Sequence, residues 1–459
     1  MAGMEKLAII GGGAAGLAAA VAAAREARNR GADAEVVVFE RDDRVGRSIL
    51  ATGNGRCNFS NAQVDAGLYR NAAFVGDALL ALTRQQRRGG DSVCAFFKEL
   101  GLVWREESEG RLYPFANKAS SVLDVLRTAA TASGVREACG RRAIRVDAPG
   151  YAGGRFHIRF EDGAVEHAAA VIVAVGGRAL ASLELPDSLP VTKPSPVLGA
   201  LRTKPAPPRD LDGVRVRCGL WLVGDRAADM RAGASDADAA GEARRAERLW
   251  SREHGMRDGS PAAVPGGGRV KAHERGELQV RPYGVSGVAV FNLSRFAHPG
   301  DRLLVDFVPD LPWQQVDQVL FSRRKALLGA IGTVDCEGML RGLLLPPLAR
   351  AVLCRAGLKP EKPFEKADVP ALGAALKALP FALDGVAEPA RCQVARGGLG
   401  VDSFDSRTMG ARDVPGLFAI GEALDVDAPC GGYNLHWAWA SGILAGRAAV
   451  RSVEGGRCA

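Results

Sequence analysis

The chain has 459 residues, of which 47% are hydrophobic and 24% are charged. A chain of this length and composition can bury a large core and is too long for one compact domain, so we expect two or three domains. The net charge of +8 is small for this length and the arginines are scattered, so we expect no nucleic-acid partner.

The nine cysteines form no CxxC pair and show no spacing typical of a metal site. This pattern indicates reduced thiols in a cytoplasmic protein, and we expect no bound metal. The alanine-rich stretch 14–24 follows a glycine loop and lacks a basic leader, so it does not have the features of a signal peptide. No apolar run reaches the length of a membrane span.

The first predicted elements are a strand, a glycine turn, a helix and a second strand. Residues 7–10 are apolar and run into Gly11-Gly12-Gly13-Ala14-Ala15-Gly16, and the apolar run 34–40 ends in Glu40. The glycines allow a tight turn and the close approach of a pyrophosphate, which then lies over the helix N-terminus. Glu40 follows Gly16 by about 24 residues, near the spacing of an acid that binds the adenosine ribose. The motif predicts an adenine dinucleotide site, although a bare glycine turn of another α/β sheet would also fit it.

The next segment, residues 49–61, is rich in glycine, asparagine, serine and threonine. It contains the run Thr52-Gly53-Asn54-Gly55-Arg56-Cys57-Asn58, and it predicts a loop with many hydrogen-bonding groups and no core pattern. Helical periodicity returns at 91–100 and at 121–132, where Ser120 or Ser121 can cap the helix.

Strand patterns follow at 143–146, 156–160 and 168–175. The last is a fully apolar run that ends at Gly176-Gly177, as a buried parallel strand would. Seven prolines between 186 and 208 then mark the exit from this domain.

The middle of the chain has a β-rich part followed by a helical part. We predict strands at 214–223, 277–293 and 302–308, and helices at 313–331, 339–355 and 369–379. Residues 225–269 read as a mobile insertion with at most one short helix around 241–253.

The last section repeats the device of strand, glycine turn and helix. Residues 414–420 form the strand, Gly421-Glu422 ends it, and Gly431-Gly432-Tyr433-Asn434 opens a helix to about residue 450. This section belongs with the N-terminal sheet, so the dinucleotide domain is predicted to be discontinuous. The predicted domains are 1–195 with 385–459, an inserted β-rich substrate domain at 196–310 with 225–270 mobile, and a helical part of the insert at 311–384.

Four blocks of the sequence carry a specific resemblance: Gly11-x-Gly13-x-x-Gly16, the run 52–58, Tyr283-Gly-Val-Ser-Gly287, and Gly421-Glu422 with Gly431-Gly-Tyr-Asn-Leu435 and Trp437-Ala-Trp439. On these blocks the chain resembles the HI0933-like flavoproteins, also called the BaiN-like or aminoacetone oxidase-like family. The resemblance spans essentially the whole chain, and the 52–58 and 431–435 blocks are far more specific than the glycine fingerprint. It implies an α/β fold of the two-dinucleotide-binding-domain, Rossmann-like type that holds FAD, with an inserted β-barrel and helical bundle.

Carried over by position, the resemblance implies FAD contacts from these blocks and from residues next to them. The residues concerned are Gly11, Gly13, Ala14, Ala15, Gly16, Glu40, Arg41, Arg47, Ser48, Thr52, Gly53, Asn54, Cys57, Asn58, Ala143, Gly176, Gly421, Glu422, Gly432, Tyr433, Asn434 and Leu435. Two departures stand out. Ser48 replaces a lysine usual in the family, and residues 180–189 lack the glycine-rich segment that the family commonly carries after this strand.

Several of these residues have a second interpretation. Arg47 can neutralise the pyrophosphate or be a solvated surface arginine, and Glu422 can accept from ribityl hydroxyls or be a surface acid. The turn at 432–434 can aim a helix N-terminus at the flavin, or it can be a plain helix start that Asn434 caps.

The candidate catalytic residues are Tyr283, as a proton donor, and His436, as an acid near the flavin ring. A structural tyrosine and a core or interface histidine are the respective alternatives. Trp437 and Trp439 face different sides of one helix, so at least one of them is expected to pack at a domain interface. Cys57 has no second cysteine nearby, so we expect no redox disulfide there.

The motifs and the resemblance together predict an FAD-dependent oxidoreductase that transfers hydride through flavin N5. A second strand-framed glycine fingerprint is missing from the sequence, so NAD(P)H is expected to visit the flavin cleft only transiently. The preferred substrate is a conjugated C=C in an apolar small molecule such as a 3-dehydro bile acid. The alternatives are oxidation of a small amine, RNA modification by a flavin enzyme, and a noncatalytic flavin sensor.

Overall fold

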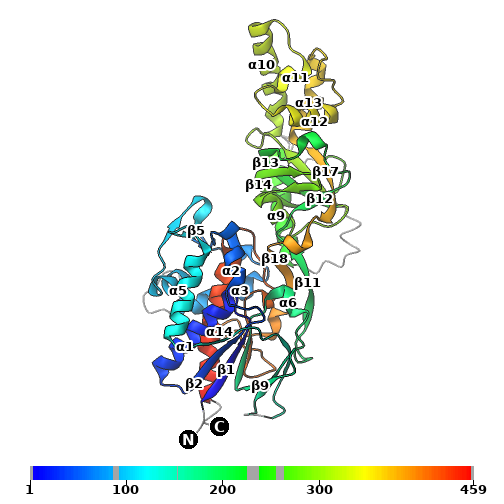
Figure 1. Ribbon diagram of the computed structural model, residues 1–459. Helices are drawn as coiled ribbons and strands as arrows, with labels where there is room; N and C mark the ends of the chain where they lie inside the picture. The colour runs from blue at the N-terminus through cyan, green and yellow to red at the C-terminus, as the bar shows by residue number, and fades with distance from the viewer. Residues whose placement is uncertain (1–3, 86–91, 152–153, 225–236, 255–262, 456–459) are drawn as a thin grey trace. The chain divides into compact units, whose positions relative to one another are not determined.

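The computed structural model describes residues 4–85, 92–151, 154–224, 237–254 and 263–455. The chain divides into two compact units (Figure 1). Unit 1 consists of Met1–Ser195 and Val394–Ala459, and unit 2 consists of Pro196–Gln393. The chain returns to unit 1 later than the predicted residue 385, because residues 379–386 form a strand of unit 2.

Unit 1 is built on a five-stranded parallel sheet in the order β19-β10-β1-β2-β6. Its strands are β1 (Glu5–Ile10), β2 (Ala34–Phe39), β6 (Arg136–Ala138), β10 (Ala170–Val173) and β19 (Leu417–Ala419). The central strands are buried on both faces, which explains their continuous apolar sequences. The chain leaves β1 toward β2 on one side, while β10 pairs with β1 on the other side. Such a switch point is where open α/β sheets bind ligands.

Two long helices, α1 (Ala14–Arg30) and α14 (Tyr433–Gly455), pack on each other and against this sheet (Figure 1). Small residues make the contact possible. A Cβ at Gly442 would lie 2.5 Å from the carbonyl oxygen of Ala15, and one at Gly446 would collide with the carbonyl oxygen of Ala19. The two ends of the chain therefore share one core.

Shorter helices and small sheets complete unit 1. The helices are α2 (Arg47–Ala51), α3 (Ala72–Arg84), α4 (Ser92–Glu99), α5 (Ala119–Ala132) and α6 (Gly176–Leu180). The three small sheets are β3-β5-β4, formed by Ser60–Asn61, Arg111–Pro114 and Trp104–Glu106; β7-β8-β9, formed by Ala143–Asp147, Phe156–Phe160 and Val165–Ala168; and β11-β18, formed by Val191–Val197 and Val394–Leu399.

Unit 2 contains a closed barrel of six strands in the order β12-β15-β14-β13-β16-β17. The strands are β12 (Leu201–Thr203), β13 (Arg215–Gly224), β14 (Arg269–Arg281), β15 (Gly284–Ser286), β16 (Arg302–Asp306) and β17 (Leu379–Val386). Alternate residues such as Leu220, Leu278 and Val305 are buried in one apolar cluster. The barrel interior is thus filled by its own side chains.

The helices of unit 2 are α8 (Ala237–His254), α9 (Val288–Leu293), α10 (Trp313–Ile331), α11 (Cys336–Leu340), α12 (Pro346–Ala356) and α13 (Val369–Lys377). Helix α8 packs on β14, and its Trp250 meets Trp221 of the neighbouring strand β13 with ring centroids 5.1 Å apart. The prediction of at most one short helix around 241–253 was wrong, because α8 has 18 residues and packs on β14. Residues 225–236 and 255–262 of the predicted insertion lie outside the described residues.

Two further predicted elements of unit 2 were wrong. Residues 277–293 were expected to form one strand, but Gly284 and Gly287 have φ of 150° and 114°, and a helix follows. In that helix Ala289, Val290 and Leu293 are buried, which is helical spacing.

Residues 339–355 were expected to form one helix, but this helix is broken between α11 and α12. Gly342 has a φ of 78°, and Pro346 occupies the first turn of the new helix, where its missing N–H costs nothing.

Two predictions in unit 1 also need correction. Residues 49–61 are not a loop without a core, because α2 enters this region and Ile49, Cys57 and Phe59 are buried. Helix α5 begins after Lys118 with no side-chain cap, so neither Ser120 nor Ser121 caps it.

Candidate functional site

The glycine turn after β1 can be made only by residues without a side chain. Gly11 has a φ of 109°, and its N–H donates to the carbonyl of Phe39 at 2.8 Å. A Cβ at Gly11 would collide with the carbonyl of Ala174, and one at Gly16 would collide with the carbonyl of Gly11. This crowding brings the end of β1, the start of α1 and the end of β10 together.

The start of α1 is suited to an anion. Its N-cap is Gly13, which makes no side-chain hydrogen bond, and the first turn, at Ala14, Ala15 and Gly16, carries no acidic residue. Backbone N–H groups and the helix dipole therefore face the turn without competition from a side chain of the cap. A pyrophosphate fits this end of the helix.

Glu40 follows β2 and is held beside the same turn. Its Oε2 accepts from the N–H of Gly12 at 2.7 Å, and its Oε1 accepts from the N–H of Asp42 at 2.9 Å. Each carboxylate oxygen has further lone pairs that can accept from ribose hydroxyls. Ribose binding by Glu40 stays a prediction.

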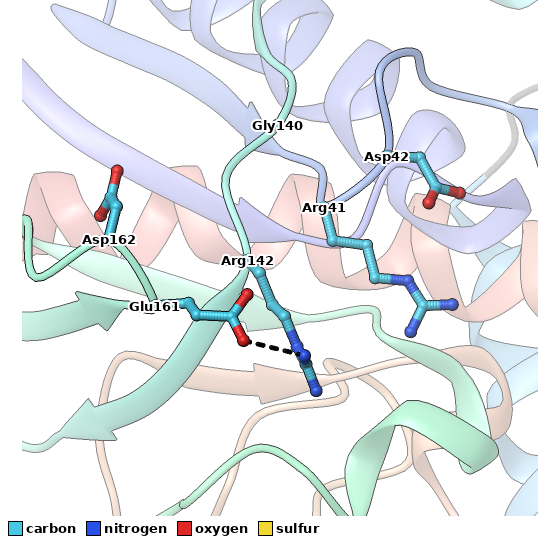
Figure 2. A pocket seen from close by; sticks show the side chains of 6 residues that line it. All are labelled: Arg41, Asp42, Gly140, Arg142, Glu161 and Asp162. Carbon is cyan, nitrogen blue, oxygen red and sulfur yellow. Dashed lines mark hydrogen bonds and ion pairs between the residues drawn. The ribbon is translucent and has the colours of Figure 1, made fainter.

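A pocket of about 470 Å³ lies beyond Glu40 at the same edge of the sheet (Figure 2). It is lined by Arg41, Asp42, Gly140, Arg142, Glu161 and Asp162. Figure 2 shows Arg142 pointing toward Glu161, with which it pairs at 3.1 Å. Of the predicted residues, Arg41 lines this pocket, while Ala143, the first residue of β7, only follows the lining residue Arg142 in sequence.

Arg47 and Ser48 start α2 and have different surroundings. Arg47 is more than half exposed and pairs with Asp42 at 3.7 Å and Asp43 at 3.6 Å. This placement matches a surface arginine. Ser48 is nearer the turn, because its Oγ lies 3.2 Å from the position of a Cβ on Gly13.

The run 52–58 has an unusual backbone. Gly53, Asn54 and Cys57 have φ between 55° and 59°, which few residues other than glycine and asparagine adopt readily. Thr52 closes the segment, because its hydroxyl donates to Ile49 and its carbonyl accepts from the N–H of Cys57. Burial raises the pKa of the Cys57 thiol to about 11, so this thiol is protonated at neutral pH.

The end of this run is hydrogen-bonded to the C-terminal part of the chain. Ser60 Oγ lies 2.8 Å from His436 Nδ1, Asn61 Nδ2 donates to Gly431, and Trp439 Nε1 donates to Phe59. These three contacts join segments more than 350 residues apart in sequence.

Asn58 provides a direct test of whether this junction fits a flavin. Its side-chain oxygen is buried and has no hydrogen-bond partner among the described residues. It lies 2.9 Å from the position of a Cβ on Gly432, and such a Cβ would also collide with the carbonyl of Ser60. A ligand with an N–H group, as the flavin ring has, can satisfy this acceptor.

Asn434 does not cap α14. Its Oδ1 accepts from the N–H of Ala428 and its Nδ2 donates to the carbonyl of the same residue, both at 2.9 Å. The alternative of a plain helix start capped by Asn434 was therefore wrong. Tyr433 and Leu435 lie in the same first turn, and the carbonyl of Tyr433 accepts from the hydroxyl of Tyr69 at 2.8 Å.

Gly421, Glu422 and Gly176 lie at the ends of β19 and β10. The N–H of Gly421 donates to Ser441 Oγ at 3.0 Å, and its carbonyl accepts from Trp437 Nε1 at 3.1 Å. Desolvation of the partly buried Glu422 carboxyl raises its pKa to about 7, so a large part of it is protonated at neutral pH.

The two candidate catalytic residues lie in different units. His436 is buried in unit 1. Tyr283 lies between β14 and β15 of unit 2, where its carbonyl accepts from the N–H of Thr203 at 3.1 Å. Trp437 and Trp439 are both buried and bond to backbone carbonyls of unit 1.

The sequence patterns did not predict two buried ion pairs of unit 1. Arg396 pairs with Asp427, and Arg70 pairs with Asp425. The one signal was the spacing of two aspartates within the largely apolar stretch 423–428.

Among residues 4–85, 92–151, 154–224, 237–254 and 263–455, no group of three or more His, Cys, Asp or Glu side chains could hold a metal ion. Within those same ranges, no helix is both long and apolar enough to cross a membrane.

Comparison with known proteins gives matches over nearly the whole chain. The sequence model described as HI0933-like protein Rossmann domain matches residues 5–448. A 3-dehydro-bile acid delta(4,6)-reductase of Clostridium scindens is 31% identical over 97% of this chain and 99% of that relative.

A ribosomal RNA dihydrouridine synthase of Escherichia coli is 26% identical over 94% of this chain and 95% of that relative. Among solved structures, FrdA of E. coli quinol fumarate reductase is 15% identical, with a TM-score of 0.40 over 98% of this chain and 70% of FrdA.

Proposed function

Since the chain belongs to the HI0933-like family and is an FAD-dependent oxidoreductase, we propose that it reduces a C=C bond conjugated with a carbonyl group. The preferred substrate is an apolar small molecule with a 3-oxo group, of the 3-dehydro bile acid kind, and the preferred electron donor is NAD(P)H. The observation that carries this proposal is the 31% identity to the bile acid reductase over 97% of this chain.

The names of two relatives support the same reaction type. A 3-dehydro-bile acid delta(4,6)-reductase acts on double bonds of a 3-oxo steroid, and a dihydrouridine synthase forms the reduced uridine ring. Both substrates contain a C=C bond conjugated with a carbonyl. The carbonyl makes the far carbon electrophilic, so hydride addition there is favoured.

The residues of unit 1 fit FAD at three places. We propose that the turn 11–16 binds the pyrophosphate, that Glu40 accepts from the ribose, and that the acceptor of Asn58 and the start of α14 bind the flavin end. When bound, FAD supplies a hydride acceptor and donor at N5. The chain contributes orientation, exclusion of water and a proton.

The proposed proton donor is Tyr283, and the reductive reaction tests it. Tyr283→Phe removes the phenol O–H and keeps the ring. We expect substrate reduction to fall by about 10²-fold or more, as loss of a general acid does, while FAD binding stays unchanged. Equal rates for the variant and the wild type would exclude Tyr283 from this role.

The main experiment is anaerobic and has two steps. NADH or NADPH is added to the FAD-loaded protein, and bleaching of the visible flavin band reports reduction. A 3-oxo-Δ4 steroid is then added, and return of the band together with a product two hydrogens heavier is the expected result. A flavin that is reduced but never reoxidised by this class of substrate would contradict the substrate proposal.

A second candidate is reduction of uridine in ribosomal RNA. It is favoured by the 26% identical relative and by the charge of unit 2, where residues 196–393 hold 29 Lys and Arg against 23 Asp and Glu. RNA binding would weaken steeply with salt, because phosphate contacts release counterions. Dihydrouridine formed in ribosomal RNA, with no turnover of the steroid, would select this candidate. Oxidation of a small amine stays a prediction from the sequence resemblance.

A further inference from the structure

Unit 1 contains buried charged side chains that the proposed cofactor contacts do not use. Asp427 has no exposed surface, and its two oxygens accept from the Nε and Nη2 of Arg396 at 2.9 and 3.1 Å. This two-point pairing fixes both the distance and the direction of the two side chains. Arg396 lies in β18, two residues after the chain returns from unit 2 at Val394.

A second buried pair lies on the same short segment. Asp425 Oδ1 accepts from Arg70 Nε at 2.9 Å and from the N–H of Gly397 at 3.0 Å. The carbonyl of Asp425 accepts from Asn71 Nδ2, and the carbonyl of Asp427 accepts from the N–H of Arg70. The residues 425–427 are therefore held by two distant parts of the chain, around 70 and around 397.

Residues 425–427 connect two proposed parts of the FAD site. Glu422 precedes it and Gly432 follows it, and between them Ala428 is bonded to Asn434 in the first turn of α14. Any displacement of Asp427 would move this connection, and with it the turn that faces Asn58 and Ser60.

A gain in stability alone does not explain why Arg396 and Asp427 form a buried ion pair. Burying two charges costs desolvation, and replacing a buried ion pair by apolar residues of similar volume is often neutral or stabilising. A fixed geometry is what the pair adds. A cofactor site needs that geometry, because contacts lose strength when donors and acceptors shift by about 1 Å.

We propose that Arg396 and Asp427 are positioning residues for FAD, which hold the loop 425–432 in the conformation that receives the flavin ring. They act through the loop backbone and through the first turn of α14.

The test compares single and double variants of the full chain, with FAD as the ligand. Arg396→Met and Asp427→Leu each leave one buried charge unpaired, while Arg396→Met/Asp427→Leu removes both charges. Arg396→Lys keeps the charge and loses the two-point pairing. The measurements are the thermal unfolding midpoint, the dissociation constant of FAD from titration of the apo-protein, and the visible spectrum of the bound flavin.

We expect both single variants to unfold at lower temperature and the double variant to recover most of that loss. The dissociation constant of FAD should stay raised by about tenfold or more in the double variant and in Arg396→Lys, with a changed flavin spectrum. If the pair served stability alone, the double variant would recover its unfolding midpoint and also its FAD affinity. That result would overturn the proposal.

Arg396→Lys decides the question if the double variant does not fold. A folded Arg396→Lys protein with wild-type FAD affinity and spectrum would equally overturn the proposal. The matched control is the buried pair of Asp306 and Lys377 in unit 2, whose Nζ and Oδ2 are 2.5 Å apart. Asp306→Leu/Lys377→Met should leave FAD affinity unchanged. No substrate or nicotinamide enters these measurements, so their outcome is independent of the proposed reaction.

Discussion

At the scale of single residues, two glutamates at the carboxyl edge of the sheet have opposite environments. Glu40 accepts two backbone N–H bonds, from Gly12 and Asp42. Glu422 is partly buried, and desolvation raises the pKa of its carboxyl to about 7. The two acids are therefore suited to different work, Glu40 as a hydrogen-bond acceptor and Glu422 as a group that titrates near neutral pH.

Replacement of Glu40 tests its role as an acceptor. Glu40→Ala leaves the N–H groups of Gly12 and Asp42 without their partner and removes the proposed ribose acceptor. We expect FAD affinity to fall by about 2–3 kcal/mol, because hydrogen bonds to a charged group are strong. Titration of the apo-protein with FAD measures this change. Glu35→Ala, which changes a partly exposed acid of β2 that pairs with Arg136, is the control, and equal losses in both variants would refute the assignment.

The raised pKa of Glu422 predicts how stability depends on pH. The folded protein keeps this carboxyl protonated up to about pH 7, while in the unfolded chain it ionises around its ordinary value of 4.5. Its stabilising contribution is complete below pH 4.5 and is lost as the pH rises through 7.

Glu422→Gln lacks this contribution at every pH. Between pH 5 and 8 the unfolding free energy of the apo-variant should therefore rise relative to that of the wild type, as measured by urea unfolding. Glu388→Gln, on the surface of unit 2, serves as control. A difference between Glu422→Gln and the wild type that stays constant with pH would show that Glu422 does not titrate in this range.

At the scale of elements, the contact between α1 and α14 depends on glycine. A Cβ at Gly446 would collide with the carbonyl of Ala19, so Gly446→Ala must move one helix away from the other. We expect a loss of about 1–3 kcal/mol in unfolding free energy, typical of overpacking. FAD affinity should also fall, since both helices begin at the proposed cofactor site.

Gly329 in α10 gives the matched control. A Cβ there meets nothing within 4 Å, so Gly329→Ala should stabilise by about 0.5–1 kcal/mol through helix propensity. Thermal unfolding of both variants measures the two effects. Similar stabilities for the two variants would mean that the helices can separate without cost.

Elements with strong local signals were predicted well from the sequence. Helix α10 has its predicted bounds, and β1, α1 and β2 follow the glycine fingerprint. The errors occurred where an apolar run changes conformation at a glycine, as before α9. Such a change depends on φ at Gly284 and Gly287, which the pattern of apolar residues does not encode.

In the candidate site too, local features were predicted from the sequence and long-range contacts were not. Its glycines and Glu40 belong to short motifs whose backbone demands are local. The ion pair of Arg396 with Asp427 and that of Arg70 with Asp425 are long-range, and local periodicity carries no information on such partners. The alternative in which Asn434 caps its own helix was wrong for the same reason, because its side chain bonds to Ala428.

At the scale of the whole molecule, unit 1 is assembled from both ends of the chain, with unit 2 as an insertion. The two segments that connect unit 1 with unit 2, residues 190–198 and 393–400, lie next to each other. The N–H of Gly400 donates to Pro190 at 3.0 Å, and the N–H of Gln393 donates to Leu198 at 3.1 Å. A short linker can therefore replace residues 199–392 without stretching either strand.

This geometry predicts that the FAD site survives removal of the insertion. With 199–392 replaced by a short glycine and serine linker, we expect the protein to bind FAD with an affinity within about tenfold of the full chain. Because FAD binds only the folded form, a concentration 100 times the dissociation constant should stabilise that protein by about 2.7 kcal/mol. A chain that ends before residue 394 lacks α14, β19 and Glu422, so it should bind no FAD and show no such shift. Thermal unfolding with and without FAD compares the two proteins, and FAD binding by the truncated chain would mean that the C-terminal segment does not build the site.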